Sequence, residues 1–356
     1  MRRLTAGGPH YYALRAGSTI GCEVYERELL MRLPAHGVDL ELGLPRDHTA
    51  APKSGWRITV LRHRVGLHWV AAPAVFGPYV LRLLRGRRVD VLRGHSVRHT
   101  GPALLLGRAL AGSRVPVVLH HHHLYPRWAR LEAAIARRAD AVVTVSEHSR
   151  RELVAAGVPA ERVHFVREGI AWPGPTEGWP DAWPGTGLRL LQLGRLEARK
   201  RPDLAIDTLA VLRRSGIDAS LVVAGEGPQE ELTARAAGLP VRFTGRVGET
   251  DKWRLYDSAD VLLFGSTLEG FGLVVAEAQS RGVPVVAAAG TATAEALDDG
   301  RTGVLAAPDA EAFAAAVRDV AGRRAEMGAA AREFARRFDW DACAAAVADI
   351  YRGLVR

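Results

Sequence analysis

Short apolar runs alternate along the chain with longer segments in which apolar residues recur every three to four positions. Runs of the first kind are typical of buried strands, and the second pattern is typical of helices that bury one face. Regular alternation of the two predicts an α/β fold built on parallel sheets. The runs expected to form strands are residues 10–14, 38–44, 89–92, 115–119, 142–145, 188–193, 220–224, 241–244, 261–264, 285–288 and 303–306.

The alternation is interrupted at residues 171–187 (AWPGPTEGWPDAWPGTG), which contain four prolines and four glycines. Such a composition predicts a linker. A chain of 356 residues also exceeds what a single core usually serves. We therefore expect an N-terminal domain over residues 1–170 and a C-terminal domain over residues 188–339, with a ligand site in the cleft between them. Residues 340–356 carry apolar side chains on one face, which predicts a helix that packs against a domain.

The composition is that of a globular protein, with 48% hydrophobic and 24% charged residues. The two cysteines, Cys22 and Cys343, cannot build a disulfide framework or a cysteine-rich zinc site, which fits a reducing cytosol. Residues 1–17 lack the continuous apolar segment that a signal peptide has. These features lead us to expect a cytoplasmic protein.

The net charge of +9 favours anionic partners. Nucleic acid is not expected among them, because the arginines are spread along the chain and no basic stripe is interleaved with aromatic residues. The nearest approach to a membrane span, residues 69–81, is too short and too broken by proline and glycine to cross a bilayer. Arginines flank it, so residues 62–88 form either a core helix with a basic end or a peripheral membrane contact.

Polar residues follow several predicted strands of the N-terminal half at their carboxyl ends, where open α/β sheets bind ligands. A glycine-bearing loop, residues 15–21, follows the first strand, His95 follows the third and Ser146 the fifth. Four consecutive histidines, residues 120–123, follow the fourth strand. Neighbouring strand residues point to opposite faces, so at most two of these histidines share a face. A single histidine that faces the crevice is therefore favoured over a metal site.

The stretch 265–284 carries the strongest functional signal and is expected to form a glycine turn and a helix between two strands. Glu269 lies in the turn, and Glu277 lies about two helical turns later on roughly the same face. The backbone N–H groups of residues 270–273 form a helix N-terminus, which attracts anions. A carboxylate beside such a helix end suggests a ligand that has both phosphate and hydroxyl groups.

Two cations, Arg195 and Lys200, lie in the loop that follows the strand 188–193. A guanidinium binds a diphosphate through paired hydrogen bonds, and an ammonium binds it as a point charge. Taken singly, each of these charges could be an ordinary surface residue. At the carboxyl ends of parallel strands, together with the two glutamates, they predict a binding site.

These residues resemble the motifs of the retaining GT-B glycosyltransferases of family 4, which use nucleotide sugars. The matching segments are GRLxxxK at residues 194–200, GEGP at residues 225–228 and GVPVV at residues 282–286. Between the last two lies the E-x7-E motif, Glu269 to Glu277, with GFG after its first glutamate. The segments occur in the family's order, and the N-terminal half resembles the family more loosely through its strand-end loops.

The resemblance implies two Rossmann-like domains that face each other across a cleft, the donor on the C-terminal one, the acceptor on the N-terminal one, and a last helix that crosses back to the N-terminal domain. The donor diphosphate would be bound by Arg195, Lys200, Gly272, Leu273 and Gly17. The ribose and base would be bound by Glu277, Arg246 and Val247, and the donor sugar by Glu269, Gly270, Phe271 and Gly272. The catalytic residues would be His122, Glu269, Arg195 and Lys200, with His121 and His123 as alternatives to His122. The acceptor side would include Gly21, His95 and Ser146.

The family also implies transfer at the front face of the sugar, with retention of configuration and with the leaving phosphate taking the acceptor's proton. Since Arg195, Lys200 and the helix end can neutralise the diphosphate, no metal or cofactor is expected beyond the nucleotide-sugar co-substrate. A GT-B sugar-nucleotide epimerase and a non-catalytic nucleotide-sugar-binding partner stay as alternatives. The motifs leave open the base, the sugar and the acceptor, which is a small molecule or a lipid-linked one. The composition resembles that of a high-GC bacterium.

Overall fold

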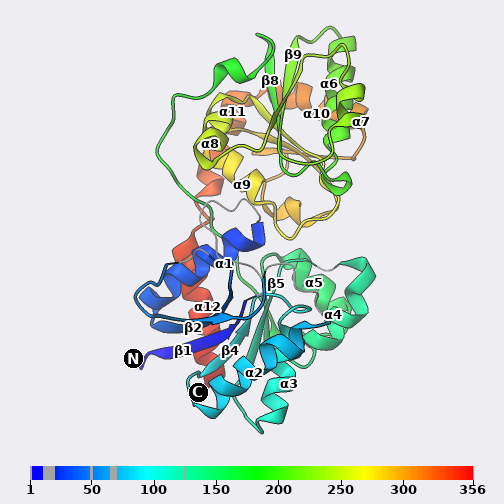
Figure 1. Ribbon diagram of the computed structural model, residues 1–356. Helices are drawn as coiled ribbons and strands as arrows, with labels where there is room; N and C mark the ends of the chain where they lie inside the picture. Colours follow the sequence, from blue (N-terminus) through cyan, green and yellow to red (C-terminus); the bar gives the residue numbers. More distant parts are fainter. Residues whose placement is uncertain (1, 11–20, 49–50, 65–69, 124, 356) are drawn as a thin grey trace. The chain divides into compact units, whose positions relative to one another are not determined.

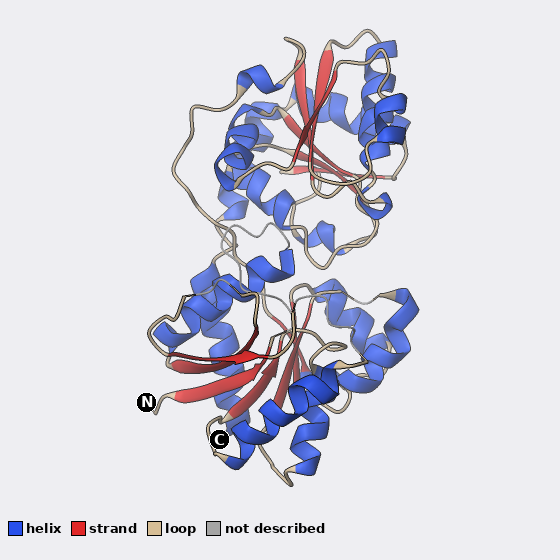
Figure 2. Ribbon diagram, viewed as in Figure 1, coloured by secondary structure: helices blue, strands red, loops and turns tan. Residues whose placement is uncertain are grey.

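The computed structural model describes residues 2–10, 21–48, 51–64, 70–123 and 125–355. The chain forms two compact units (Figures 1 and 2). The first unit comprises Met1–Gly169 together with Asp339–Arg356, and the second comprises Ile170–Phe338. Each unit is a parallel sheet covered by helices, so the expectation of two Rossmann-like domains is confirmed.

The first unit contains a seven-stranded sheet in the order β3-β2-β1-β4-β5-β6-β7, in which every pair is parallel. Its strands are β1 (Leu4–Pro9), β2 (Val38–Pro45), β3 (Trp56–Leu61), β4 (Val91–Gly94), β5 (Val117–His121), β6 (Ala141–Thr144) and β7 (Val163–Phe165). Its helices are α1 (Gly21–Arg32), η1 (Leu33–His36), α2 (Ala72–Arg85), α3 (Gly101–Leu110), η2 (Pro126–Trp128), α4 (Ala129–Ala136), α5 (Glu147–Ala155), η3 (Ala160–Arg162) and α12 (Trp340–Val355). The strand order reverses between β1 and β4, and such a switch point is where α/β sheets bind ligands.

The first strand lies earlier in the chain than its apolar pattern predicts. The sequence predicts a strand at residues 10–14, whereas β1 is Leu4–Pro9. Two glycines make this segment look like a loop, but they are needed by the packing: a Cβ on Gly8 would lie 2.0 Å from the carbonyl oxygen of Arg93, on the neighbouring strand. Residues 11–20, which include the predicted phosphate ligand Gly17, lie outside the described residues.

The last helix, α12, belongs to the first unit, where it packs on α1 and η1. The apolar face seen in the sequence is its buried face, formed by Trp340, Ala344, Val347 and Tyr351. The chain therefore returns to the first unit after completing the second, as the ribbon colours show (Figure 1).

The second unit contains a six-stranded parallel sheet in the order β10-β9-β8-β11-β12-β13. Its strands are β8 (Leu188–Leu193), β9 (Ala219–Ala224), β10 (Val241–Gly245), β11 (Val261–Phe264), β12 (Val285–Ala288) and β13 (Gly303–Ala306). Its helices are η4 (Pro180–Ala182), η5 (Ala198–Lys200), α6 (Pro202–Arg214), α7 (Glu230–Arg235), α8 (Glu249–Ser258), α9 (Leu273–Ser280), η6 (Ala292–Glu295), α10 (Ala310–Gly322) and α11 (Arg324–Ala335). A core of aliphatic residues lies between the sheet and its helices.

The proline- and glycine-rich segment 171–187 is anchored to the second unit. The backbone N–H and hydroxyl of Thr176 donate to Asp257 of α8 at 2.9 and 2.6 Å. Trp183 is buried, and its indole N–H donates to the carbonyl of Leu190 at 3.1 Å. These contacts fix a segment whose composition alone predicts only a linker.

A buried polar network joins α12 to the sheet of the first unit. Arg93, on β4, donates two hydrogen bonds to Glu26 of α1, at 2.7 and 2.9 Å, and one to the Tyr351 hydroxyl at 3.2 Å. The ring of His120, on β5, lies between two hydroxyls, 2.9 Å from that of Tyr25 and 3.0 Å from that of Tyr351. Burial alone would raise the pKa of Glu26, but its pairing with Arg93 lowers that pKa below its ordinary value.

Burial also holds several histidines of this unit in the neutral form. Burial lowers the pKa of His10 to about 4 and that of His121 to about 3, from an ordinary value of 6.5. The unfolded chain therefore binds protons that the folded chain rejects as the pH falls below about 6.5. We expect the free energy of unfolding of the first unit to fall between pH 6.5 and pH 4, measured by urea denaturation across that range. A stability that stays constant over this interval would contradict the buried neutral histidines.

Candidate active site

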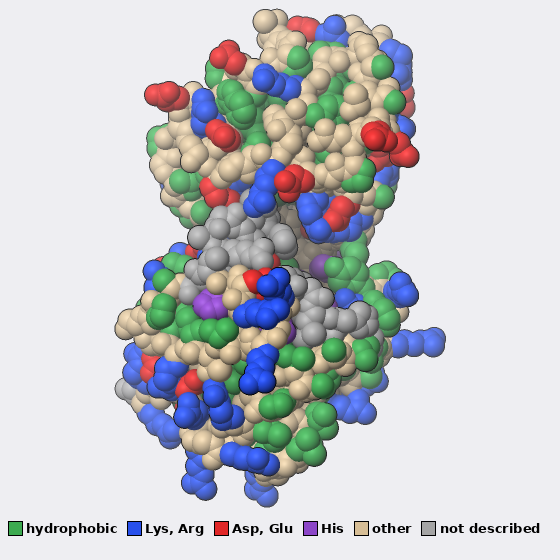
Figure 3. All heavy atoms as spheres, in the orientation of Figure 1, with side chains coloured by type: hydrophobic (Ala, Val, Ile, Leu, Met, Phe, Trp, Pro, Cys, Tyr) green, Lys and Arg blue, Asp and Glu red, His purple; other side chains and the backbone are tan. Residues whose placement is uncertain are grey.

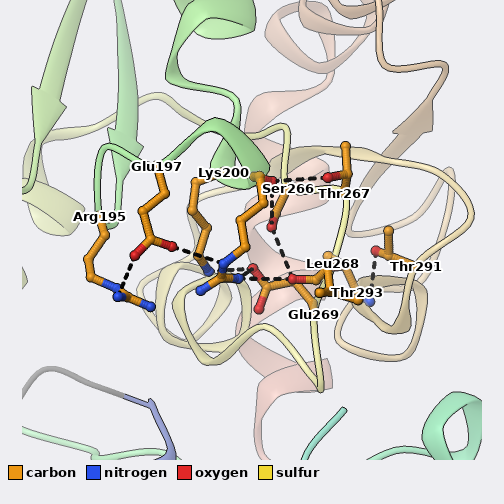
Figure 4. Close-up of polar contacts among 10 residues, drawn as sticks. Arg195, Glu197, Lys200, Ser266, Thr267, Leu268, Glu269, Thr291 and Thr293 are labelled. Carbon is orange, nitrogen blue, oxygen red and sulfur yellow. Dashed lines mark hydrogen bonds and ion pairs between the residues drawn. The ribbon is translucent and has the colours of Figure 1, made fainter. Parts of the chain in front are cut away.

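The candidate site lies where the loops after β8, β11 and β12 meet at the carboxyl edge of the second sheet (Figure 4). The loops that follow β8 and β9 approach closely, since a Cβ on Gly225 would lie 1.8 Å from the carbonyl oxygen of Gly194. Gly272, which precedes α9, has φ of 101°, a conformation that side chains disfavour. These glycines let two loops and a helix N-terminus lie side by side.

A chain of ion pairs crosses this edge. Lys200 forms an ion pair and hydrogen bond with Glu269, and both side chains are largely buried. Glu197 bridges Arg195 and Arg199, and Arg199 also donates to the carbonyl of Leu268 at 3.1 Å. Figure 4 shows Arg195, Glu197, Lys200 and Glu269 on these loops, with Glu197 next to Arg195. The structure thus brings together three of the four residues predicted to be catalytic.

The N-terminus of α9 lies on the same edge, next to Glu269. The first N–H groups of a helix have no partner within the helix, so those of Leu273 and its neighbours can donate to an anion. Phe271 is buried, and its ring packs against that of Phe338 with a centroid distance of 5.2 Å. The Phe271 side chain therefore anchors the turn, and any contact it makes with a sugar is through its backbone.

Glu277 is in a different setting from Glu269, although the two share a helix and its preceding turn. Its carboxylate faces α8, where Lys252 lies 2.8 Å from Oε1 and the Tyr256 hydroxyl lies 3.0 Å from Oε2. The sequence predicts Glu277 as a ligand of the donor ribose and base. The structure shows a buried, paired carboxylate, and Lys252 and Tyr256 are partners that the motif did not indicate.

The remaining predicted residues of this unit follow β10. Gly245 ends that strand with φ of 67°, Arg246 is exposed and Val247 is half-buried. These residues lie beyond the carboxyl end of β10, which is separated by β9 from β8, the strand that Arg195 follows. They are therefore at the same carboxyl edge of the sheet as Arg195.

Sequence reasoning missed a hydroxyl pair in the loop after β12. Thr291 caps η6 by accepting a hydrogen bond from the N–H of Thr293. Thr293 is fully buried, and its Oγ1 has no hydrogen-bond partner among the described residues. This hydroxyl lies 3.5 Å from where a Cβ of Gly272 would be, so the loop approaches the start of α9 (Figure 4). Small polar residues at a carboxyl strand end are the signal that could have found it.

In the first unit, the histidine run separates into buried and half-buried members. His120 and His121 are buried in the strand, and His123 packs its ring against Tyr125 with centroids 4.3 Å apart. His122 is half-buried, with its Nδ1 3.6 Å from Oε1 of Glu168 and its ring 4.9 Å from that of Tyr25. Glu168 is buried, so a carboxylate lies beside the ring of the histidine predicted to be catalytic.

The three residues predicted to lie on the acceptor side have different structural settings. Gly21 begins α1. His95 is buried and stacks on His10, with ring centroids 5.1 Å apart. Ser146 is buried and caps α5 by accepting a hydrogen bond from the N–H of Ser149 at 3.1 Å. The Ser146 hydroxyl therefore has a structural role as the cap of a helix, in addition to any role in acceptor binding.

Carboxylates at the start of α12 have the spacing of an Asp-x-Asp tripeptide, Asp339-Trp340-Asp341. Asp339 accepts a hydrogen bond from the N–H of Asp341 at 2.8 Å, and the Asp341 carboxylate lies 3.6 Å from Arg32. Across the described ranges, no group of three or more His, Cys, Asp or Glu side chains is arranged to hold a metal ion.

Comparison with known families accounts for both halves of the chain. The family described as "Glycosyltransferase Family 4" matches residues 20–171, and that described as "Glycosyl transferases group 1" matches residues 177–338. The chain belongs to the group 1 glycosyltransferases with the GT-B fold. The order of motifs in the sequence had predicted this family, and that prediction is confirmed.

Curated relatives of this glycosyltransferase family include mycobacterial enzymes. The chain is 35% identical over 237 residues to a glycogen synthase of Mycobacterium tuberculosis, which is 62% of this chain and 56% of that protein. It is 38% identical over 192 residues to a GDP-mannose-dependent alpha-(1-6)-phosphatidylinositol dimannoside mannosyltransferase of the same species, 53% of this chain and 47% of that protein. The chain thus spans about half the length of the curated relatives it matches.

Among solved structures, the fold is similar to that of Anabaena Alr3699/HepE in complex with UDP-glucose. The TM-score is 0.74 with 18% identity, and the similarity covers 99% of this chain and 100% of that chain. At this identity the likeness concerns the fold.

The basic end of α2 was predicted to be either a core helix end or a membrane contact. Residues Arg82, Arg85, Arg87 and Arg88 are exposed around its C-terminus, while the opposite face of the helix is buried in the core. Basic side chains are numerous on the visible face of this unit (Figure 3). Within the described parts of the chain, no helix is both long and apolar enough to cross a membrane.

Proposed function

We propose that this protein transfers a sugar from a nucleoside-diphosphate sugar to a hydroxyl acceptor with retention of configuration. The observation that carries the proposal is the pairing of Lys200 with Glu269 beside the N-terminus of α9, with Glu277 further along the same helix. Cations and helix N–H groups suit a diphosphate, and the carboxylates suit sugar hydroxyls. Relatives named for glycogen synthesis and mannosyl transfer, and a fold neighbour with bound UDP-glucose, support it.

In the proposed reaction, the ion pair between Lys200 and Glu269 breaks, and the Lys200 ammonium binds the donor diphosphate instead. Arg195, Lys200 and the N–H groups of Gly272 and Leu273 then stabilise the charge that develops on the leaving diphosphate. Glu269, released from Lys200, accepts hydrogen bonds from the donor sugar. In the first unit, the buried carboxylate of Glu168 limits the orientations of the ring of His122, the histidine predicted to be catalytic. The acceptor hydroxyl attacks from the face that the diphosphate leaves, and its proton passes to the leaving phosphate.

Ligand-induced stabilisation tests the donor class. A ligand that binds only the native protein raises its unfolding temperature. We expect one member of a panel of UDP, GDP, ADP and dTDP to raise the unfolding temperature, with inorganic phosphate as the control. If every member of the panel left the unfolding temperature unchanged at millimolar concentration, the donor site would be misassigned.

For the acceptor, we propose a lipid-linked or membrane-borne hydroxyl compound reached through the basic end of α2. Exposed arginines there would bind anionic lipid at about 1 kcal/mol each, and the name of the mannosyltransferase relative includes a lipid, phosphatidylinositol dimannoside. We expect the protein to sediment with anionic vesicles at low salt and to be released by high salt, and the Arg85→Glu, Arg88→Glu variant to stay in solution. Equal sedimentation of the wild type and the variant would contradict this contact.

A further inference from the structure

Both carboxylate oxygens of Glu277 are held by side chains of α8. The Lys252 ammonium lies 2.8 Å from Oε1, and the Tyr256 hydroxyl donates to Oε2 at 3.0 Å. Neither helix partner belongs to the motifs that mark the family in this sequence. Lys252 and Tyr256 are therefore two further residues of the site, in contact with the carboxylate that is proposed to bind the donor ribose.

The surroundings make this arrangement rigid. Glu277 is 8% exposed, and its partner Tyr256 is fully buried. The Lys252 ammonium also lies 3.1 Å from Oε2 of Glu249 and sits over the Trp253 ring, 5.0 Å from its centroid. Burial alone would lower the pKa of Lys252, but Glu277 and Glu249 raise it above its ordinary value, so the ammonium stays charged.

The number of hydrogen bonds that a carboxylate can accept decides what Glu277 can still do. An ionised carboxylate has about four acceptor positions, two on each oxygen. Lys252 occupies one on Oε1 and Tyr256 occupies one on Oε2. One position on each oxygen is left, and two adjacent acceptors match the two hydroxyls of a vicinal diol.

We propose that Lys252 and Tyr256 are positioning residues that fix the Glu277 carboxylate to accept both hydroxyls of a ribose, and that the protein therefore selects ribonucleotide donors over 2′-deoxyribonucleotide donors. This inference rests on the proposed function, in which Glu277 binds the donor ribose. It narrows the donor class, because a dTDP-sugar lacks one of the two hydroxyls.

The role of Lys252 can be separated from a general structural role by comparing two ligands. If Lys252 only supported the fold, its loss would weaken the binding of ribonucleotides and the binding of 2′-deoxyribonucleotides by the same factor. If it positions Glu277, its loss removes the interaction that distinguishes the two. The ratio of their dissociation constants is therefore the informative quantity, and it needs no knowledge of the acceptor.

The experiment is calorimetric titration of the full chain with UDP, GDP or ADP, whichever binds, and with its 2′-deoxy counterpart. A hydrogen bond to a charged group predicts that the wild type prefers the ribonucleotide by about tenfold or more. We expect this preference to fall to about twofold or less in Lys252→Met, and to an intermediate value in Tyr256→Phe. Lys53→Met removes the same group from an exposed position of the first unit and should keep the full preference.

Each outcome is informative. If the wild type binds no nucleoside diphosphate, the proposed function fails. If the wild type prefers the ribonucleotide and Lys252→Met keeps that preference, the inference is overturned while the proposed function stands. A wild type that binds both ligands equally overturns the inference directly. Should Lys252→Met fail to fold, Tyr256→Phe, which loses only a hydroxyl, decides through the same ratio.

Discussion

Replacing Lys200 with alanine is expected to lower the rate of sugar transfer by a factor of about 10² to 10³, which is typical of removing one preorganised charge-stabilising group. Lys200 is the last residue of η5, and it already pairs with Glu269 in this structure. Its removal takes a positive charge from the proposed diphosphate site and leaves the largely buried Glu269 carboxylate without that partner. The anionic leaving group would then face a carboxylate whose remaining cation, Arg199, lies 4.0 Å away.

The measurement is the initial rate of release of the nucleoside diphosphate under saturating donor. Lys200→Arg keeps the charge with a different shape and should retain part of the rate, whereas Lys53→Ala, in the first unit, should leave the rate unchanged. A Lys200→Ala enzyme that is folded and turns over within twofold of the wild type would show that the pair with Glu269 is only structural.

Replacing Arg93 with methionine is expected to lower the free energy of unfolding by about 3 to 5 kcal/mol, the usual effect of removing one member of a buried ion pair. Arg93 is fully buried and binds both carboxylate oxygens of Glu26, at 2.7 and 2.9 Å. Its loss leaves a buried carboxylate without its cation. It also removes the hydrogen bond to Tyr351, through which α12 is joined to β4.

Urea denaturation followed by circular dichroism measures this effect. Adding Glu26→Gln to Arg93→Met removes the buried, unpaired negative charge. The double variant should therefore recover a large part of the lost free energy of unfolding. The exposed pair between Arg2 and Asp90, at 2.9 Å, provides the contrast, and Arg2→Met should change stability little. A loss of less than about 1 kcal/mol in Arg93→Met would mean that the Glu26 carboxylate is compensated by other groups.

Most of the strands could be predicted from the sequence because their physical signature is local. The central strands of a parallel sheet are buried on both faces, so most of them are continuous apolar runs. The predicted runs 188–193, 261–264, 285–288 and 303–306 coincide with the observed strands of the second unit. The sequence did not predict β1, because this strand contains Gly7 and Gly8 where an apolar run would have bulky residues. The two glycines allow β1 to pack closely against β2 and β4.

The motifs predicted which residues gather at the edge of the second sheet, but not what each contacts. Lys200 and Glu269 were assigned to separate parts of the donor, yet they pair with each other here. The contact between Glu277 and Lys252 joins two helices whose spacing in the chain carries no signal. The Arg93–Glu26 pair is likewise a product of tertiary packing, because long-range contacts depend on how helices and strands are arranged.

Cleavage of the donor by the purified chain tests the central claim most directly. The protein would be incubated in EDTA with UDP-glucose, GDP-mannose, an ADP-sugar and a dTDP-sugar, with a membrane lipid extract as the source of the hydroxyl acceptor, and release of the nucleoside diphosphate would be followed by mass spectrometry. The account predicts release from one ribonucleotide donor without added metal, and loss of that release in Lys200→Ala. If a donor bound but stayed intact under all conditions, with and without a divalent metal, the protein would be a non-catalytic nucleotide-sugar binder and the account would be contradicted.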